Sequence, residues 1–304
     1  MIPVTGWCCR KNWSVMSDAY LDQVRLLLRV LPLVAQEDVF ALKGGTAINL
    51  FERNFPRLSV DIDLTYVPFD ERAIALGNIE AALGRIKTKI EKSFEGVTVT
   101  KVQQGDGTEA KLHCQYQRTH IKIEVNTIML GHICPPRMMA CTDKVQEQFE
   151  AFAEIAVVSK GELYGGKICA ALDRQHPRDL FDVKHLLDDE GLTHDIKQGM
   201  IAGLLSHPRP ISEVLFPTFR DQRAIFDAQF AGMAFDPFSY DDYEATRVRL
   251  NDAVQSTLTA NDKAFLLSFK AGEPDWSLID IPDLSRMPAI RKCRRNPALS
   301  VSGR

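Results

Sequence analysis

Several features that would identify a protein class at once are scarce or missing from this sequence. Its seven cysteines are scattered without a C-x-x-C pair, and its seven histidines show no H-E-x-x-H motif or zinc-ligand spacing. No apolar run approaches the ~18 residues that a membrane-spanning helix needs, and no secretory signal peptide is evident. We therefore expect a cytoplasmic protein with free thiols and without a membrane partner.

An excess of positive charge is also absent. The chain carries 37 Lys and Arg against 40 Asp and Glu, a net charge of −3. The whole chain is therefore not a basic nucleic-acid-binding protein, and any contact with RNA must come from a local basic patch. With 45% hydrophobic and 25% charged residues over 304 positions, the composition fits a globular protein of one large domain or two ordinary ones.

The spacing of apolar residues divides the chain into two halves. The first mixes helical spacing with the period-two alternation of strands, whereas the second is mainly helical. The clearest segments of the first half are the helices 17–36 and 70–94 and the strands 58–65, 97–102, 110–116 and 120–127. We predict an α+β fold, with a mixed domain over residues 1–135, a mostly helical domain over 136–285, and a basic, flexible tail over 286–304.

Two aspartates lie one residue apart in the alternating segment that ends near residue 65. Because residues i and i+2 share a face of a strand, Asp61 and Asp63 are neighbours there, and two carboxylates repel unless a cation lies between them. Glu124 lies on the polar face of a later predicted strand. If the strands are adjacent, the three acids suit a two-metal site for phosphoryl transfer. A D-x-D pair alone is more often the wet face of an edge strand.

A glycine pair precedes these acids by about a dozen residues. Gly44 and Gly45 lie between a predicted short strand and a helix that begins near Thr46, where backbone amides can approach a phosphate closely. Thr46 is expected to cap that helix or to bond a phosphate oxygen. Glycines alone also fit an ordinary turn, but the pair combined with D-x-D and a later acid favours a nucleotide site.

A second glycine motif competes with the first. The segment GELYGGKI, residues 161–168, fits G-x-x-x-x-G-K and follows EIAVVS, a possible strand. Ile168 replaces the Ser or Thr that would bind Mg²⁺, and helical spacing continues through Leu163, Lys167 and Ala171. We therefore expect a helix here rather than a phosphate-binding loop.

The stretch GGTAINLFERNFPRLSVDIDL resembles the signature of the nucleotidyltransferase superfamily, and more narrowly the AbiEii/AbiGii toxin family of bacterial toxin–antitoxin and abortive-infection systems. Three further segments match the family pattern between residues 121 and 187. They are IKIEVN with Lys122 and Glu124, ELYGGKICAALDR with Lys167, and RDLFDV with Arg178, Asp179 and Asp182. Arg178 stands where members often have lysine, which keeps the charge but changes the geometry.

The resemblance implies a nucleotidyltransferase fold with the nucleotide in a groove between the two domains. Asp61, Asp63 and Glu124 would bind Mg²⁺ or Mn²⁺, with Glu124 alternatively taking the proton of the attacking hydroxyl, and Lys167 would reach the triphosphate of the NTP. The other nucleotide-binding positions would be Gly44, Gly45, Thr46, Ser59, Arg178, Asp179 and Asp182. Asp179 and Asp182 would orient Lys167 or Arg178, or touch the base or ribose; a surface salt bridge is the alternative.

The function implied is that of a toxin, neutralised by a cognate antitoxin, that transfers nucleotides from an NTP to RNA. The expected acceptor is the 3′ end of tRNA, and the result would be a block of translation and growth. Positive charge for RNA would come from the predicted tail and from Lys160, Lys167, Arg174, Arg178 and Lys184. Transfer to a protein or small-molecule hydroxyl, and NTP binding without catalysis, are the alternatives. Ser59 is a hypothetical phosphorylation site beside the acids.

Overall fold

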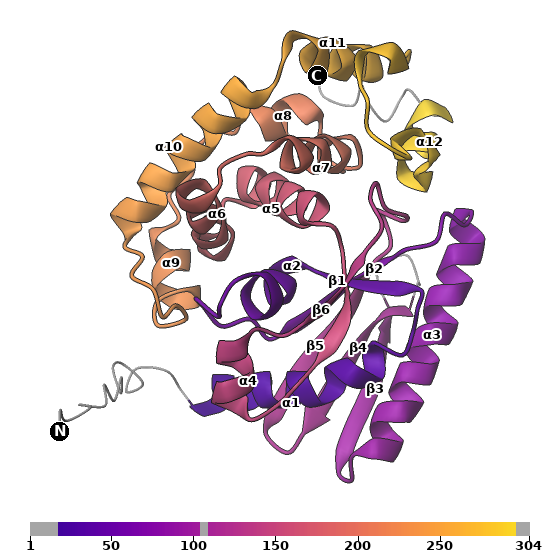
Figure 1. Ribbon diagram of the computed structural model, residues 1–304, viewed down its shortest axis with the longest axis vertical. Helices are drawn as coiled ribbons and strands as arrows, with labels where there is room; N and C mark the ends of the chain where they lie inside the picture. Colours follow the sequence, from indigo (N-terminus) through magenta and orange to yellow (C-terminus); the bar gives the residue numbers. More distant parts are fainter. Residues whose placement is uncertain (1–17, 104–108, 296–304) are drawn as a thin grey trace, which may run out of the picture.

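The computed structural model describes residues 18–103 and 109–295 of the chain (Figure 1). Within them, one seven-stranded mixed sheet has the order β3-β4-β5-β2-β1-β7-β6. The pairs β2·β5 and β1·β7 are parallel and the other four are antiparallel. The strands are β1 (Phe40–Lys43), β2 (Asp61–Tyr66), β3 (Val97–Gln103), β4 (Glu109–Tyr116), β5 (Thr119–Asn126), β6 (Arg137–Ala140) and β7 (Glu154–Val157).

The alternating sequence patterns explain the strands of the first half. In β5, Ile121, Ile123 and Val125 are buried, whereas the residues between them are not, as a period of two requires. Helices α1 (Asp18–Val34) and α3 (Arg72–Ser93) contact the sheet and each other, and their buried residues fall on one side of each helix. The predicted helices and strands of this half are therefore confirmed.

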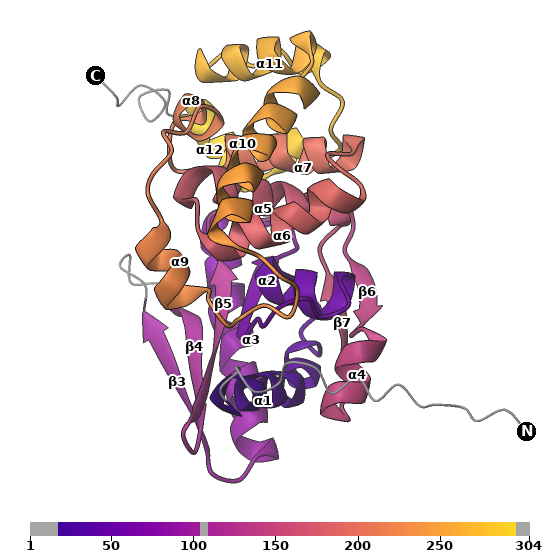
Figure 2. The same cartoon turned by 90° about the vertical axis from the view of Figure 1, so that its left-hand side faces the viewer.

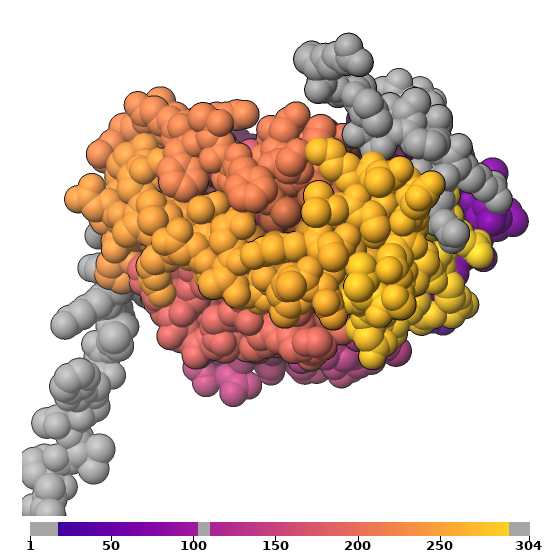
Figure 3. Space-filling model, turned by 90° about the horizontal axis from the view of Figure 1, so that it is seen from above, coloured from indigo at the N-terminus to yellow at the C-terminus, as the bar shows by residue number. Residues whose placement is uncertain are grey.

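The second half is mostly helical. Figures 1 and 2 show α5 to α8 and α10 to α12 stacked above the sheet, and the view from above shows the later helices, in orange and yellow, over much of the molecule (Figure 3). The helices are α4 (Asp143–Phe149), α5 (Lys160–Arg174), α6 (Pro177–Asp189), α7 (His194–Leu205), α8 (Ile211–Leu215), α9 (Arg223–Gln229), α10 (Tyr240–Thr257), α11 (Ala260–Lys270) and α12 (Pro288–Arg295). No helix of the described residues is long and apolar enough to span a membrane.

The second glycine motif lies inside helix α5 and serves packing. A Cβ atom on Gly165 would lie 2.2 Å from the backbone carbonyl carbon of Gly199 in α7, and one on Gly161 would lie 2.5 Å from the Asp195 carbonyl oxygen. These glycines therefore let two helix backbones approach each other closely. The expectation of a helix instead of a phosphate-binding loop is confirmed, although strand β7 does precede it.

Two parts of the structure extend beyond the sequence prediction. Strands β6 and β7 belong to the sheet although they follow residue 135, so the division into domains stays a prediction. Part of the predicted flexible tail is the helix α12, anchored by the fully buried side chains of Met287 and Ile290. The structure therefore differs from the prediction there, because two apolar side chains give the basic segment a packed face. Residues 296–304 of that tail lie outside the described residues. The α+β fold class is confirmed.

Candidate active site

The glycine turn lies directly against the second aspartate of the D-x-D pair. Gly44 follows β1 with φ +75°, a conformation that other residues rarely adopt, and a Cβ there would lie 2.4 Å from Asp63 Oδ2. A Cβ on Gly45 would lie 2.9 Å from Ser59 Oγ and 2.9 Å from Arg57 Nη2. Glycine is therefore needed at position 44, whereas a side chain at position 45 would displace the side chain of Ser59 or Arg57.

Thr46 holds the turn to the beginning of β2. Its buried hydroxyl donates to the Asp61 carbonyl oxygen at 2.5 Å and lies 3.0 Å from Ser59 Oγ. It does not cap a helix, because the helix begins at Gly44 and no side chain caps it, so the first of the two expected roles is wrong. The bond to a phosphate oxygen stays a prediction. The next six residues, Ala47–Glu52, form a π-helix, a rare form that often occurs at functional sites.

Three carboxylates lie on adjacent strands, as the alternation predicts. Asp61 and Asp63 share a face of β2, and Asp63 is paired in register with Glu124 of the parallel strand β5. Burial and the neighbouring charge of Asp61 raise the pKa of Asp63, against the opposing effect of Lys43 and Lys167. The negative charges of Asp61 and Asp63 therefore repel each other in this site, as the sequence predicts.

The third acid has a cation of its own. Glu124 Oε2 lies 2.9 Å from Lys111 Nζ on β4, and within residues 18–103 and 109–295 no group of three His, Cys, Asp or Glu side chains is arranged to hold a metal ion. The predicted binding of a metal by Asp61, Asp63 and Glu124 together therefore stays a prediction. Asp61 and Asp63 remain, and they fit Mg²⁺, which proteins commonly hold by one or two carboxylates together with substrate phosphates.

Lys43, at the end of β1, is a member of the site that the sequence interpretation missed. It is paired in register with Asp63, and burial lowers its pKa against the opposing charges of Asp63 and Glu162. The available signal was its position, immediately before the glycine pair at the end of a strand. Its ammonium lies close enough to the Asp63 carboxylate for their charges to interact.

A buried ionic network forms the opposite side of the site. Lys167 Nζ of α5 lies 2.7 Å from Asp179 Oδ1 and 3.1 Å from Asp182 Oδ2, both on α6. The two aspartates are 1% exposed, so the alternative of a surface salt bridge is wrong. Burial alone would raise their pKa values, but Lys167, together with Arg174 at Asp179 and Arg57 at Asp182, holds both below the usual range.

Arg57 and Asn49 join this network to the glycine turn, and the sequence interpretation missed both. Arg57 is buried and forms two hydrogen bonds to Asp182, of 2.7 and 2.5 Å. Asn49 Nδ2 donates to Asp182 Oδ1 at 3.1 Å and to the Gly45 carbonyl oxygen at 2.9 Å. The signal for Arg57 was its place two residues before the S-x-D-x-D segment, whereas Asn49 gave none.

The family of this protein follows from a match to known sequences. Residues 25–290 match the family model described as nucleotidyl transferase AbiEii toxin, type IV TA system. The chain belongs to the AbiEii family. It is therefore a nucleotidyltransferase toxin of a toxin–antitoxin system, with an NTP as substrate and an antitoxin as partner.

Solved structures resemble the AbiEii chain in fold. MenT4, a nucleotidyltransferase toxin from Mycobacterium tuberculosis H37Rv, is 17% identical with a TM-score of 0.63, and the match covers 94% of this chain and 93% of that one. A putative nucleotidyltransferase from H. pylori is 16% identical with a TM-score of 0.42, over 79% of this chain and 95% of that one. No curated protein sequence matches significantly.

The positive charges expected to bind RNA in this AbiEii protein are mostly neutralised. Each of four predicted residues binds a carboxylate: Lys160 binds Glu52 and Glu190, Lys167 binds Asp179 and Asp182, Arg174 binds Asp179, and Lys184 binds Asp188. Among the described residues, the Arg178 guanidinium has no ion pair, whereas Asp179 and Asp182 both bind Lys167. Four of the five cations predicted in the helical half are therefore paired with carboxylates, and residues 296–304 of the predicted basic tail lie outside the described residues.

Proposed function

We propose that this AbiEii toxin transfers a nucleotide from an NTP to a hydroxyl of RNA, at the 3′ end of tRNA, with Mg²⁺ or Mn²⁺ as cofactor. The consequence would be a block of translation and growth, which also stops phage propagation in an infected cell. The observation that carries the proposal is the approach of the Gly44–Gly45 turn to Asp63. Backbone amides that can accept a phosphate thereby lie beside two carboxylates that need a cation.

In this proposal, residues from two sides of the site contact the triphosphate of the NTP. The triphosphate would lie along the glycine turn, where Ser59 offers a hydroxyl and Lys43 offers positive charge. Asp61 and Asp63 would hold the divalent cation, which supplies positive charge to the phosphoryl oxygens when bound. Lys167 would face the phosphates from α5, with Asp179 and Asp182 fixing its position. Arg178 would contribute an uncompensated guanidinium at the beginning of α6.

The reaction would be an in-line displacement at the α-phosphate. The acceptor hydroxyl oxygen forms a bond to the α-phosphorus, the bond from that phosphorus to the bridging oxygen breaks, and pyrophosphate leaves. Glu124 would take the proton of the hydroxyl, because the register of β2 and β5 places it directly beside Asp63. In this proposal, residues 1–135 and 136–285 are the two domains, and the nucleotide lies in the groove between them.

One observation favours a second candidate function. The predicted basic patch is largely neutralised by carboxylates, and an enzyme that transfers the nucleotide to a protein or small-molecule hydroxyl would need no such patch. That acceptor class would leave the chemistry at Asp61, Asp63 and Glu124 unchanged. The two candidates therefore differ in the acceptor of the nucleotide, which is RNA in the first and a protein or a small molecule in the second.

A transfer experiment tests the proposal. Purified protein is incubated with Mg²⁺, bulk tRNA and each α-³²P-labelled NTP in turn, beside an Asp61→Ala, Asp63→Ala variant and an Asp252→Ala variant. We expect label on tRNA that is lost in the double variant but kept by Asp252→Ala, which removes an exposed carboxylate of α10. Label on protein or on a small molecule would favour the second candidate. Bound NTP without any transfer would contradict both and indicate an NTP-binding protein without catalysis.

A further inference from the structure

The loop between α8 and α9, residues 216–222, is fixed to the C-terminal end of α5. The Gln175 side chain is 2% exposed; its Nε2 donates to the Thr218 carbonyl oxygen at 2.9 Å, and its Oε1 accepts from the Arg220 backbone N–H at 3.1 Å. Gln222 Nε2 donates to the Arg174 carbonyl oxygen at 3.3 Å. These hydrogen bonds, made by two buried side chains, hold the loop backbone in one position.

This fixed loop presents apolar and positive side chains to solvent. Phe216 is 68% exposed and Phe219 is 41% exposed, and the Arg247 guanidinium lies 4.3 Å from the Phe219 ring centroid. Arg220 is exposed, and its guanidinium has no ion pair within the part of the chain that the structure describes. Large apolar side chains that are held out into water on an ordered loop are typical of an interaction surface.

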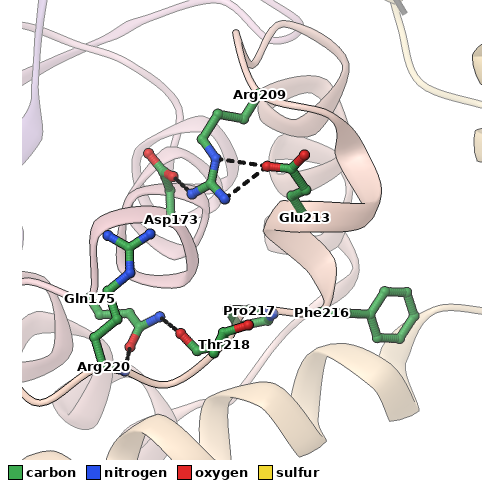
Figure 4. Close-up of a pocket in the computed structure, with 8 residues that line it drawn as sticks. All are labelled: Asp173, Gln175, Arg209, Glu213, Phe216, Pro217, Thr218 and Arg220. Carbon is green, nitrogen blue, oxygen red and sulfur yellow. Dashed lines mark hydrogen bonds and ion pairs between the residues drawn. The ribbon is translucent and has the colours of Figure 1, made fainter. Parts of the chain in front are cut away.

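A cavity of about 260 Å³ lies beside the loop, at the end of α5. Figure 4 shows Arg209 held between Asp173 and Glu213, whereas the Arg220 guanidinium extends from the loop toward Asp173 without a marked interaction, and the Phe216 ring points away from these polar groups. Arg209 is therefore occupied by the two carboxylates of the pocket, whereas the Arg220 guanidinium, among the described residues, forms no ion pair and can contact a ligand.

The same end of α5 reaches the active site. Arg174 lies between two residues of the pocket lining, Asp173 and Gln175, and its Nε donates to Asp179 at 2.6 Å. The pKa of Arg174 is raised mainly by that hydrogen bond, and the charge of Asp63 also contributes. The catalytic carboxylates therefore lie within electrostatic reach of the residue that separates the pocket from Lys167.

We propose that Phe216, Phe219 and Arg220 form the docking surface for the RNA acceptor. The inference rests on the proposed function, because it gives the acceptor a place beside the site of transfer. Exposed rings can stack on unpaired bases, which all have an aromatic face, and a guanidinium without an ion pair can bind a phosphate. A single-stranded RNA end offers both groups together. It fits this surface better than the predicted patch, whose cations already bind carboxylates.

The experiment measures binding of bulk tRNA to the full chain without NTP, so that it does not depend on catalysis. We expect Phe216→Ala, Phe219→Ala to weaken binding about tenfold or more, since each stacked base contributes roughly 1–3 kcal/mol. Arg220→Ala should reduce the slope of log K against log salt concentration by about 1, and Arg220→Lys should restore it. The matched control is Phe152→Ala, Arg118→Ala, which removes an equally exposed ring and an exposed arginine at the turn between β4 and β5.

Each outcome decides the inference. Weaker binding by the loop variants, with the control and the urea midpoints unchanged, supports it. If the loop variants bind tRNA as the wild type does, the exposed rings belong to a protein-binding surface and the inference is overturned. Absence of any tRNA binding by the wild type overturns it as well. Wild-type binding that depends on the loop, without transfer of label to tRNA, would contradict the proposed function and leave this surface standing.

Discussion

Asp182 offers the sharpest test of whether the buried ionic network stabilises the protein. Its carboxylate binds Arg57 through two hydrogen bonds of 2.7 and 2.5 Å, and it also accepts from Asn49 at 3.1 Å and lies 3.1 Å from the Lys167 ammonium. The substitution Asp182→Asn keeps the size and shape of the side chain and removes its charge. The buried Arg57 would then lose its carboxylate partner, and Lys167 would have to share the carboxylate of Asp179 with Arg174.

The expected effect is large. Removing one partner of a buried ion pair lowers the free energy of unfolding by about 3–5 kcal/mol, because the remaining charge stays buried without a partner. A chain of this size has a total of about 5–15 kcal/mol, and each kcal/mol moves the unfolding temperature by ~2–4 °C. We therefore expect Asp182→Asn to lower Tm by about 6–20 °C.

The assay is urea denaturation followed by circular dichroism, with Asp188→Asn as the matched control. Asp188 is on the same helix and also binds two cations, Lys184 at 2.7 Å and Arg249 at 2.8 Å, but its side chain is 37% exposed. Exposed pairs contribute about 0–1 kcal/mol, so this control should unfold almost as the wild type does. Equal, small effects of the two substitutions would refute the reasoning, since burial would then make no difference.

The pH dependence gives an independent check on the same residue. Burial alone would raise the pKa of Asp182, but Arg57 and Lys167 hold it below the usual value of about 3.9. A lowered pKa in the folded state stabilises the fold above the unfolded pKa, and this contribution is lost as the pH falls through the folded pKa. The difference between wild type and Asp182→Asn should therefore be full near pH 7 and shrink below about pH 4.

Two further predictions concern helix packing and the proposed catalytic acids. Gly165→Ala should lower the free energy of unfolding by ~1–3 kcal/mol or more, because its Cβ would lie 2.2 Å from the Gly199 backbone. The control Gly166→Ala, whose Cβ would have nothing within 4 Å, should be neutral or stabilising. The midpoints of urea denaturation measure the difference, and equal midpoints would contradict the packing argument. Asp63→Asn should stabilise the fold at neutral pH, because burial and Asp61 raise the pKa of Asp63 and so disfavour its charge. This gain should vanish below about pH 3.9, where the carboxyl is protonated in both states, and a loss of stability at pH 7 would count against it.

Local patterns in the sequence predicted the part of the site that depends on local geometry. The alternation around Asp61 and Asp63 placed both on one face of β2, and the alternation of β5 placed Glu124 on its polar face; the register then brought Glu124 opposite Asp63. A glycine pair after a short strand is likewise a local signal. Periods of two and of 3.6 residues are fixed by backbone geometry, so these assignments need no knowledge of the tertiary fold.

The rest of the site depends on contacts between residues far apart in the chain. Arg57 meets Asp182 across 125 residues, and Asn49 meets it across 133, so no spacing rule connects them. The prediction that Thr46 caps a helix is wrong for a related reason. Its hydroxyl donates to the Asp61 carbonyl oxygen, 15 residues later in the chain, and this contact exists only once β2 has formed. The neutralised basic patch is another case, because the partners of Lys160 come from two other elements.

The buried charges also determine which parts of this enzyme can move during transfer. From the glycine turn to the end of α5, hydrogen bonds and ion pairs connect Gly45, Asn49, Asp182, Lys167, Asp179 and Arg174 without a break. Sliding α5 and α6 away from the turn would leave buried charges unpaired, at several kcal/mol each. The glycine turn and the helices α5 and α6 are therefore held at a fixed separation, and in the proposed reaction the acceptor has to be brought to the nucleotide between them. The proposed docking loop meets that requirement, because Gln175 fixes it to the end of α5, the helix that carries Lys167.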